Sequence, residues 1–161
     1  MPSPSANPIR LQVIDRVVTV LGAITAGADY FFTPGRVVKR WVHLDEINAF
    51  PCYMVTAGEK GGQIITSGAP DVYEETFYIS VKGVIKDSSD TVTKCEQALR
   101  DIRKAINTDS MSGASGSLGA ITDSIKCTEG PDMDDGYLSL EGYGFFDQRV
   151  EVQIHGNFGE L

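Results

Sequence analysis

Long apolar runs are absent from this 161-residue sequence. A membrane-spanning helix needs roughly 20 consecutive apolar residues, and no stretch comes near that length. The first eight residues, MPSPSANP, also lack the basic start and the apolar centre of a signal peptide. We therefore expect a protein that is made in the cytoplasm and does not enter a membrane.

Cysteine and histidine are scarce as well. Cys52, Cys95 and Cys127 are an odd number without CxxC spacing, so the sequence indicates neither a disulfide framework nor a zinc site. The two histidines, His43 and His155, lie in no recognisable catalytic motif, and we expect both at the surface or at an interface. The glycines match neither the dinucleotide-binding nor the P-loop pattern. The sequence thus gives no catalytic residue, no metal site and no cofactor.

Positive charge is in short supply. Fourteen Lys and Arg residues stand against 22 Asp and Glu residues, which gives a net charge of −8. Affinity for nucleic acid comes from cations that neutralise phosphates, so the negative net charge argues against a protein that binds DNA tightly. It is compatible with a protein that DNA only passes. One basic group, Arg36, Lys39 and Arg40 beside Trp41, is interpreted as lining a subunit interface or lumen rather than as a nucleic-acid patch.

One strand followed by one helix is the strongest pattern that is present. Phe77, Ile79 and Val81 alternate with polar residues, which predicts a half-buried strand that continues to Lys86. Asp87 is a candidate N-cap for the next helix, predicted over residues 89–107. Apolar residues recur in that helix at spacings of three and four, so one stripe faces the strand. Cys95, in this stripe, is expected to be buried.

The other segments complete an α+β pattern. A first helix is predicted over residues 7–25, with Asn7 as N-cap and Gly27 beyond its end. Further strands are predicted at residues 30–42 (bent at 33–35), 52–56, 121–127, 137–141 and 146–154, with a helical turn at 45–49. The order α-β-β-β-α-β-β-β predicts a single domain over residues 1–161. It consists of two helices on one face of a mainly antiparallel sheet, after an extended segment at residues 1–7.

Two long loops, at residues 58–70 and 108–120, are rich in Gly and Ser and are candidates for contact with partners. Apolar residues also occur where a core does not need them, for example Phe31, Tyr143 and Phe145. Both features are typical of a subunit in an oligomer. The predicted partner-binding residues are Gly61, Gly62, Ile64, Ile65, Ser112, Gly113 and Leu118.

The order of elements resembles a known family. The first helix, the strands at residues 36–42 and 52–56, and the run Glu-x-Phe-x-Ile-x-Val-x-Gly at 75–83 precede the second helix and a closing meander. In this order and length the chain resembles the tail terminator (tail completion, minor tail) proteins of long-tailed bacteriophages. The resemblance covers most of the chain but lies in topology and hydrophobic pattern, not in a diagnostic motif.

The resemblance implies a virion structural protein made in the host cytoplasm. Six subunits would form a ring at the head-proximal end of the tail tube, stop its polymerisation and present a surface to the head-completion (neck) protein. Double-stranded DNA would pass through a lumen lined by the sheets, and no catalytic residue or cofactor would be needed.

Three alternatives remain open at this point. The chain could be a head–tail joining, neck or tube protein of the same virion. It could be a small α+β enzyme or ligand-binding protein with a site near His43, Asp45 and Cys52, which would need a concave pocket with converging polar groups. It could also be a cellular scaffold ring.

Overall fold

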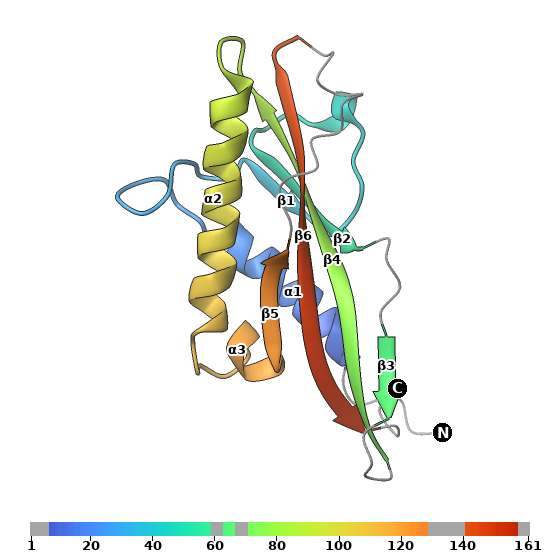
Figure 1. Cartoon of the computed structure of the whole chain (residues 1–161). Coiled ribbons are helices and arrows are strands. Elements are labelled where there is room, and N and C mark those ends of the chain that lie inside the picture. The colour runs from blue at the N-terminus through green and yellow to red at the C-terminus, as the bar shows by residue number, and fades with distance from the viewer. Residues whose placement is uncertain (1–6, 59–62, 67–70, 129–140, 158–161) are drawn as a thin grey trace.

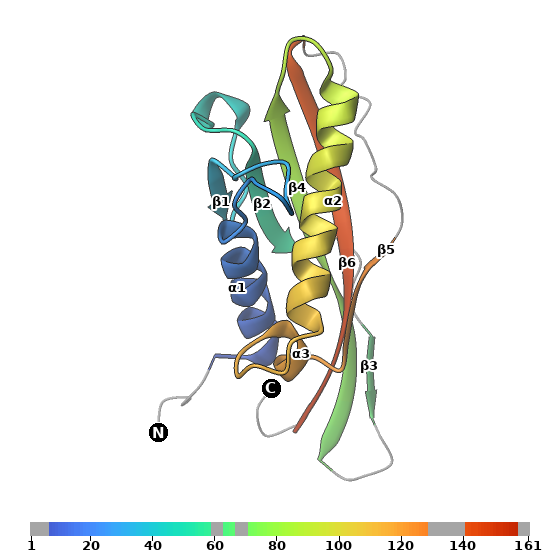
Figure 2. The same cartoon turned by 90° about the vertical axis from the view of Figure 1, so that its left-hand side faces the viewer.

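The chain forms an α+β fold, as expected, but the described residues form three α-helices rather than the predicted two, packed on one face of a mixed sheet (Figures 1 and 2). The computed structural model describes residues 7–58, 63–66, 71–128 and 141–157. The helices are α1 (Ile9–Gly22), the 3-10 turn η1 (Leu44–Glu46), α2 (Thr91–Ser110) and α3 (Leu118–Ile121). The strands are β1 (Arg36–Val38), β2 (Cys52–Ala57), β3 (Gln63–Thr66), β4 (Val72–Lys86), β5 (Ser124–Thr128) and β6 (Tyr143–Asn157).

Strands β4 and β6 form the centre of the sheet. They pair antiparallel along their whole length, from Val72 opposite Asn157 to Lys86 opposite Tyr143. The strand order is β1-β2-β4-β6-β5, and β3 also pairs with β4. Because β6 occupies one side of β4 throughout, β2 and β3 share its other side. Among the described strands only β1 and β2 run parallel, so the sheet is mixed rather than wholly antiparallel.

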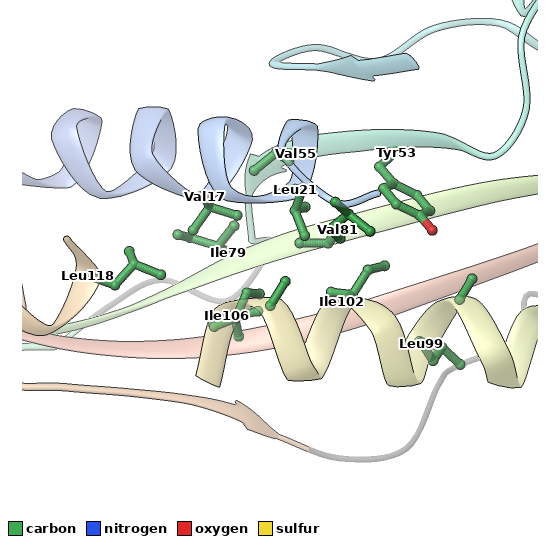
Figure 3. Close-up of a cluster of buried hydrophobic side chains, with 14 of the residues drawn as sticks. Val17, Leu21, Tyr53, Val55, Ile79, Val81, Leu99, Ile102, Ile106 and Leu118 are labelled. Atoms are coloured by element: carbon green, nitrogen blue, oxygen red, sulfur yellow. The ribbon is translucent and has the colours of Figure 1, made fainter. Parts of the chain in front are cut away.

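The alternation in β4 sends its odd-numbered apolar residues toward the helices. Phe77, Ile79 and Val81 are fully or almost fully buried there. The main core joins them to α1, α2, α3 and β2, and Figure 3 shows part of this cluster. The labelled residues are Val17, Leu21, Tyr53, Val55, Ile79, Val81, Leu99, Ile102, Ile106 and Leu118.

Helix α2 confirms the predicted apolar stripe from the buried Cys95 to Ile106, whereas Val92, which was predicted to belong to it, is exposed. Its N-cap, however, is Asp90, whose side chain accepts a 3.0 Å hydrogen bond from the N–H of Thr93. The prediction of Asp87 as N-cap is therefore wrong. Asp87 instead orders the preceding turn by accepting hydrogen bonds from the N–H groups of Asp90 and Ser89, which lower the pKa of Asp87 to about 2.

The predicted strand over residues 30–42 is largely wrong, because only Arg36–Val38 is a strand. The Oδ2 atom of Asp101 in α2 accepts hydrogen bonds from the N–H groups of Phe31 and Phe32, at 2.8 and 3.0 Å. These backbone groups are then not free to join a sheet. Cations of α2 also lie over the aromatic rings of this segment, with Arg100 5.2 Å from the Phe31 ring and Lys104 5.3 Å from the Tyr30 ring. The aromatic residues 30–32 are therefore held against α2 rather than forming a strand.

Other boundaries also differ from the expectation. The N-cap of helix α1 is Pro8, with no side-chain cap, so the prediction of Asn7 as N-cap is wrong, and the helix ends at Gly22, short of residue 25. Helix α2 continues to Ser110 and α3 starts at Leu118, so the loop predicted over residues 108–120 shrinks to 111–117. Residues 63–66 form an additional strand. The strand predicted at 137–141 lies outside the described residues except for Glu141, which is in a turn.

Candidate interaction surface

The second face of the sheet is the one that carries none of the three α-helices of the described chain. Near residues 52–54 it is apolar and is covered by the segment at residues 42–50 with η1. The buried cluster there consists of Val42, Ile47, Cys52, Met54, Val84 and Phe145. The rest of this face is polar, and we call it the open face. Its side chains include those of Thr56, Glu74, Thr76, Tyr78, Ser80, Lys82, Ser124, Lys126, Thr128, Asp147, Arg149, Glu151, Gln153 and His155.

Charges on the open face are paired across neighbouring strands. Lys82 of β4 lies 3.4 Å from the Oδ2 atom of Asp147 on β6, and the Ser80 hydroxyl donates to Oδ1 of the same carboxylate at 2.6 Å. In a second row, Glu151 lies 2.9 Å from the Lys126 ammonium and accepts a 3.3 Å hydrogen bond from Tyr78. Directly opposed residues share one face of a sheet, so this pairing follows from the strand register. The open face is therefore charged but locally neutralised.

The basic group predicted at an interface or lumen is engaged within the chain. Arg36 donates to the backbone carbonyl of Glu46 at 3.1 Å, and Arg40 lies 3.6 Å from the carboxylate of the same residue. Lys39 pairs with Asp15 of α1. These contacts hold the segment around η1 against the domain, so the three cations do not form a free patch. Trp41, beside them, is half-exposed and lies over the Lys82 ammonium at 4.2 Å.

The predicted partner-binding residues fall into three groups. Ile64 lies on β3 with 52% of its surface exposed, Ile65 is on the same strand, and Gly61 and Gly62 lie outside the described residues. In the remaining loop, Gly113 is exposed and Ser112 is half-buried. Leu118 is wrong as a contact residue, because it is fully buried in the main core.

Sequence reasoning missed a basic groove between α2 and β5. The groove has a volume of about 710 Å³ and is lined by Arg100, Arg103, Lys104, Ile106, Asn107, Ile125, Lys126 and Cys127. Arg103 donates from Nε to the side-chain carbonyl of Gln148 at 2.7 Å, and Gln148 is fully buried. A signal existed in the sequence: residues 100, 103 and 104 share one face of a helix.

The His43, Asp45 and Cys52 group does not form a site. His43 and Asp45 are exposed, whereas Cys52 is fully buried in the cluster beneath the segment at residues 42–50. Burial raises the pKa of the Cys52 thiol, which is the reverse of what a nucleophilic cysteine requires. His155 is at the surface, as predicted, and its Nδ1 atom lies 2.6 Å from Asp123.

Among the described residues no three His, Cys, Asp or Glu side chains come together as possible metal ligands, and none of the helices there has the length and apolar character to cross a membrane. No protein-family model matches the chain, and no curated protein matches its sequence.

Proposed function

We propose that the chain is a tail terminator of a long-tailed bacteriophage, a virion structural protein without catalytic activity or a cofactor. Copies of it, six in the family that the sequence resembles, form a ring at the head-proximal end of the tail tube. The ring stops tube polymerisation, offers a docking surface to the neck protein and lets double-stranded DNA pass through its lumen.

The observation that carries this proposal is the open face. A channel for DNA needs a wall that neither traps the duplex nor excludes water. Unpaired Lys and Arg residues would bind phosphates and release counterions, which is the source of strong, salt-dependent DNA affinity. On the open face the Lys82 and Lys126 ammonium groups are already paired with carboxylates of β6. Such a wall is polar and wettable, and it offers few free cations to a phosphate backbone.

The arrangement of the helices also supports the proposal. All three α-helices of the described chain pack on the face opposite the open face (Figure 2). A ring whose sheets line the lumen would carry these helices on its outside. The projecting end of β3 and the loop at residues 111–117 would remain available for the tube, the neck protein or neighbouring copies.

The test is the mass of the purified chain in solution, followed by mixing with tail tubes of the same phage and electron microscopy. We expect a closed oligomer, alone or on the tube, that sits at one end of the tube and prevents further growth. A chain that polymerises by itself into long tubes would identify a tube subunit instead.

Binding to the assembled head rather than to tubes would indicate a neck protein. A chain that stays monomeric and ignores tube ends would contradict the proposal and direct attention to a ligand-binding role.

A further inference from the structure

The basic groove lies between the C-terminal half of α2 and β5, the strand at one edge of the sheet (Figure 2). It is separate from the open face, because the lining residues Ile125 and Cys127 of β5 face the helices. Its volume of about 710 Å³ falls within the range of roughly 300–1,000 Å³ that is usual for small-molecule sites. The groove is therefore large enough for a small ligand.

Four cations line the groove, and they differ in how they are paired. Three have a carboxylate partner: Arg100 pairs with Asp101, Lys104 with Asp29 and Lys126 with Glu151. Arg103 has no carboxylate partner among the described residues and donates to the neutral side chain of Gln148. The uncompensated positive charge of the groove is therefore that of Arg103.

A buried side chain holds Arg103 in position. The Nε atom of Arg103 donates to the Oε1 atom of Gln148 at 2.7 Å, and Gln148 is fully buried. The Nε2 atom of Gln148 donates in turn to the backbone carbonyls of Arg149 and Thr128, at 2.9 and 3.4 Å. Both ends of the Gln148 amide are thus engaged, which fixes the guanidinium. Its Nη1 and Nη2 groups have no partner among the described residues and remain available to bind an oxyanion.

The charge of Arg103 also acts on the β5 wall of the groove. Burial raises the pKa of the Cys127 thiol to about 11, and the positive charge of Arg103 opposes this rise. Half-buried Ile125 adds apolar surface to the same wall, and the exposed amide of Asn107 lies one helical turn after Arg103. The groove thus combines a fixed guanidinium, a neutral polar group and an apolar wall.

We infer that this groove binds a small molecule that carries a phosphate group, with the phosphate on the Nη groups of Arg103 and the apolar part of the ligand against Ile125. A phosphate monoester carries a charge of about −1.5 to −2 at neutral pH and binds a guanidinium through two oxygens. Arg100 and Lys104 add positive charge beside it. A small ligand is favoured over nucleic acid, because a phosphate backbone requires several unpaired cations and the chain has a net charge of −8.

The test measures the binding of AMP and pyrophosphate to the full-length chain by isothermal titration calorimetry at constant ionic strength. We expect both probes to bind and to raise the midpoint of thermal unfolding with increasing concentration, because a ligand of the folded chain stabilises it. Adenosine is the matched control, since it lacks only the phosphate of AMP. It should bind at least about tenfold more weakly.

Two variants locate the phosphate. Arg103→Gln removes the guanidinium and should weaken the binding of AMP at least about tenfold. Asn107→Asp places a carboxylate in the groove at an exposed position that does not contact Gln148, and it should weaken binding by a similar factor. The control Lys94→Gln removes one positive charge from the same helix outside the groove and should leave the affinity unchanged. Circular dichroism verifies that each chain is folded.

Several outcomes would overturn the inference. They are the absence of binding by both probes, equal affinities of the unchanged chain and the two groove variants, and equal affinities for AMP and adenosine. Tight, salt-dependent binding of duplex DNA that is lost in Arg103→Gln would show that the groove takes nucleic acid instead. The site does not depend on the proposed ring: a chain that caps tubes without binding AMP or pyrophosphate would reject only the site. A chain that binds AMP without capping tubes would support the site and reject only the terminator role.

Discussion

The carboxylate of Asp101 is fully buried where α2 meets the segment at residues 29–32. It accepts hydrogen bonds from two backbone N–H groups, those of Phe31 and Phe32. Replacing Asp101 with Ala leaves both donors without their acceptor, so we expect the free energy of unfolding to fall by about 2–4 kcal/mol. Urea denaturation followed by circular dichroism measures this. The matched change Glu96→Ala, at an exposed site on the same helix, should alter stability by less than about 0.5 kcal/mol.

Asp109 connects three helices through one carboxylate. It pairs with Arg16 of α1 at 2.6 Å and accepts a 2.8 Å hydrogen bond from the N–H of Leu118 in α3. The hydrogen bond from Arg16 lowers the pKa of Asp109. Because the folded-state pKa is the lower one, the stabilisation is complete above the unfolded-state pKa of about 3.9 and is lost as the pH falls through the folded-state value.

The variant D109N tests this linkage. It should be less stable than the unchanged chain at neutral pH, and the difference between the two should shrink as the pH falls below about 4. Urea midpoints measured from neutral to acidic pH provide the comparison. Some acid dependence remains in the variant, because the pKa of Asp87 is also lowered. A stability difference that stays constant with pH would contradict the assignment.

Among the elements, β4 depends on a glycine near its C-terminal end. The ring of Phe146 on β6 lies over Gly83, and a Cβ atom added at Gly83 would be 1.9 Å from the ring atom Cζ. The same ring packs edge-on against Tyr53, with the ring centroids 6.1 Å apart. Gly83→Ala should therefore force these aromatic rings to move and destabilise the domain by roughly 1–3 kcal/mol.

A second glycine gives the control. Gly22 ends α1 with no atom near its Cβ position, so Gly22→Ala should leave stability unchanged or raise it by up to about 1 kcal/mol. Thermal unfolding of both variants makes the comparison. Equal stability of the Gly83 and Gly22 variants would show that the Phe146 ring has room to move.

At this scale the sequence predicted the elements whose periodicity was strong. The α2 stripe and the alternation of β4 were found because each pattern spans several turns or residue pairs and faces a single core. Residues 30–32 were misassigned because aromatic residues favour strands, whereas the N–H groups of Phe31 and Phe32 donate to Asp101, which is distant in sequence. Leu118 was wrongly placed in a loop because its Gly/Ser-rich neighbours gave no sign of the short helix α3. The N–H group of Leu118, the first residue of that helix, donates to Asp109. The groove could not be predicted from the sequence, because its lining comes from both α2 and β5 and their relative position is known only from the structure.

At the scale of the whole molecule, the open face predicts weak contact with DNA. The variant with Asp147→Lys and Glu151→Lys would replace two paired carboxylates by cations beside Lys82 and Lys126. We expect this chain to bind double-stranded DNA with an affinity that falls as salt increases, and the unchanged chain to bind far more weakly. Fluorescence anisotropy of a labelled duplex measures both.

The control for this variant reverses charge elsewhere. Asp45→Lys with Glu141→Lys makes the same change in net charge outside the open face. If this chain gained the same DNA affinity, the effect would come from net charge rather than from the open face. If neither chain bound DNA, the pairing on the open face would have no role in preventing retention of DNA.

The long β4–β6 pair has a consequence for how the chain is made. During translation β4 emerges from the ribosome well before β6. The β6 partners of β4, from Asn157 opposite Val72 to Tyr143 opposite Lys86, are not yet made at that stage. In the interval β4 exposes one fifteen-residue edge of unpaired backbone groups, and such edges promote association between unfinished chains. The edge of β4 is therefore covered only once β6 has been made. A chaperone would be needed most during the interval before β6 is translated.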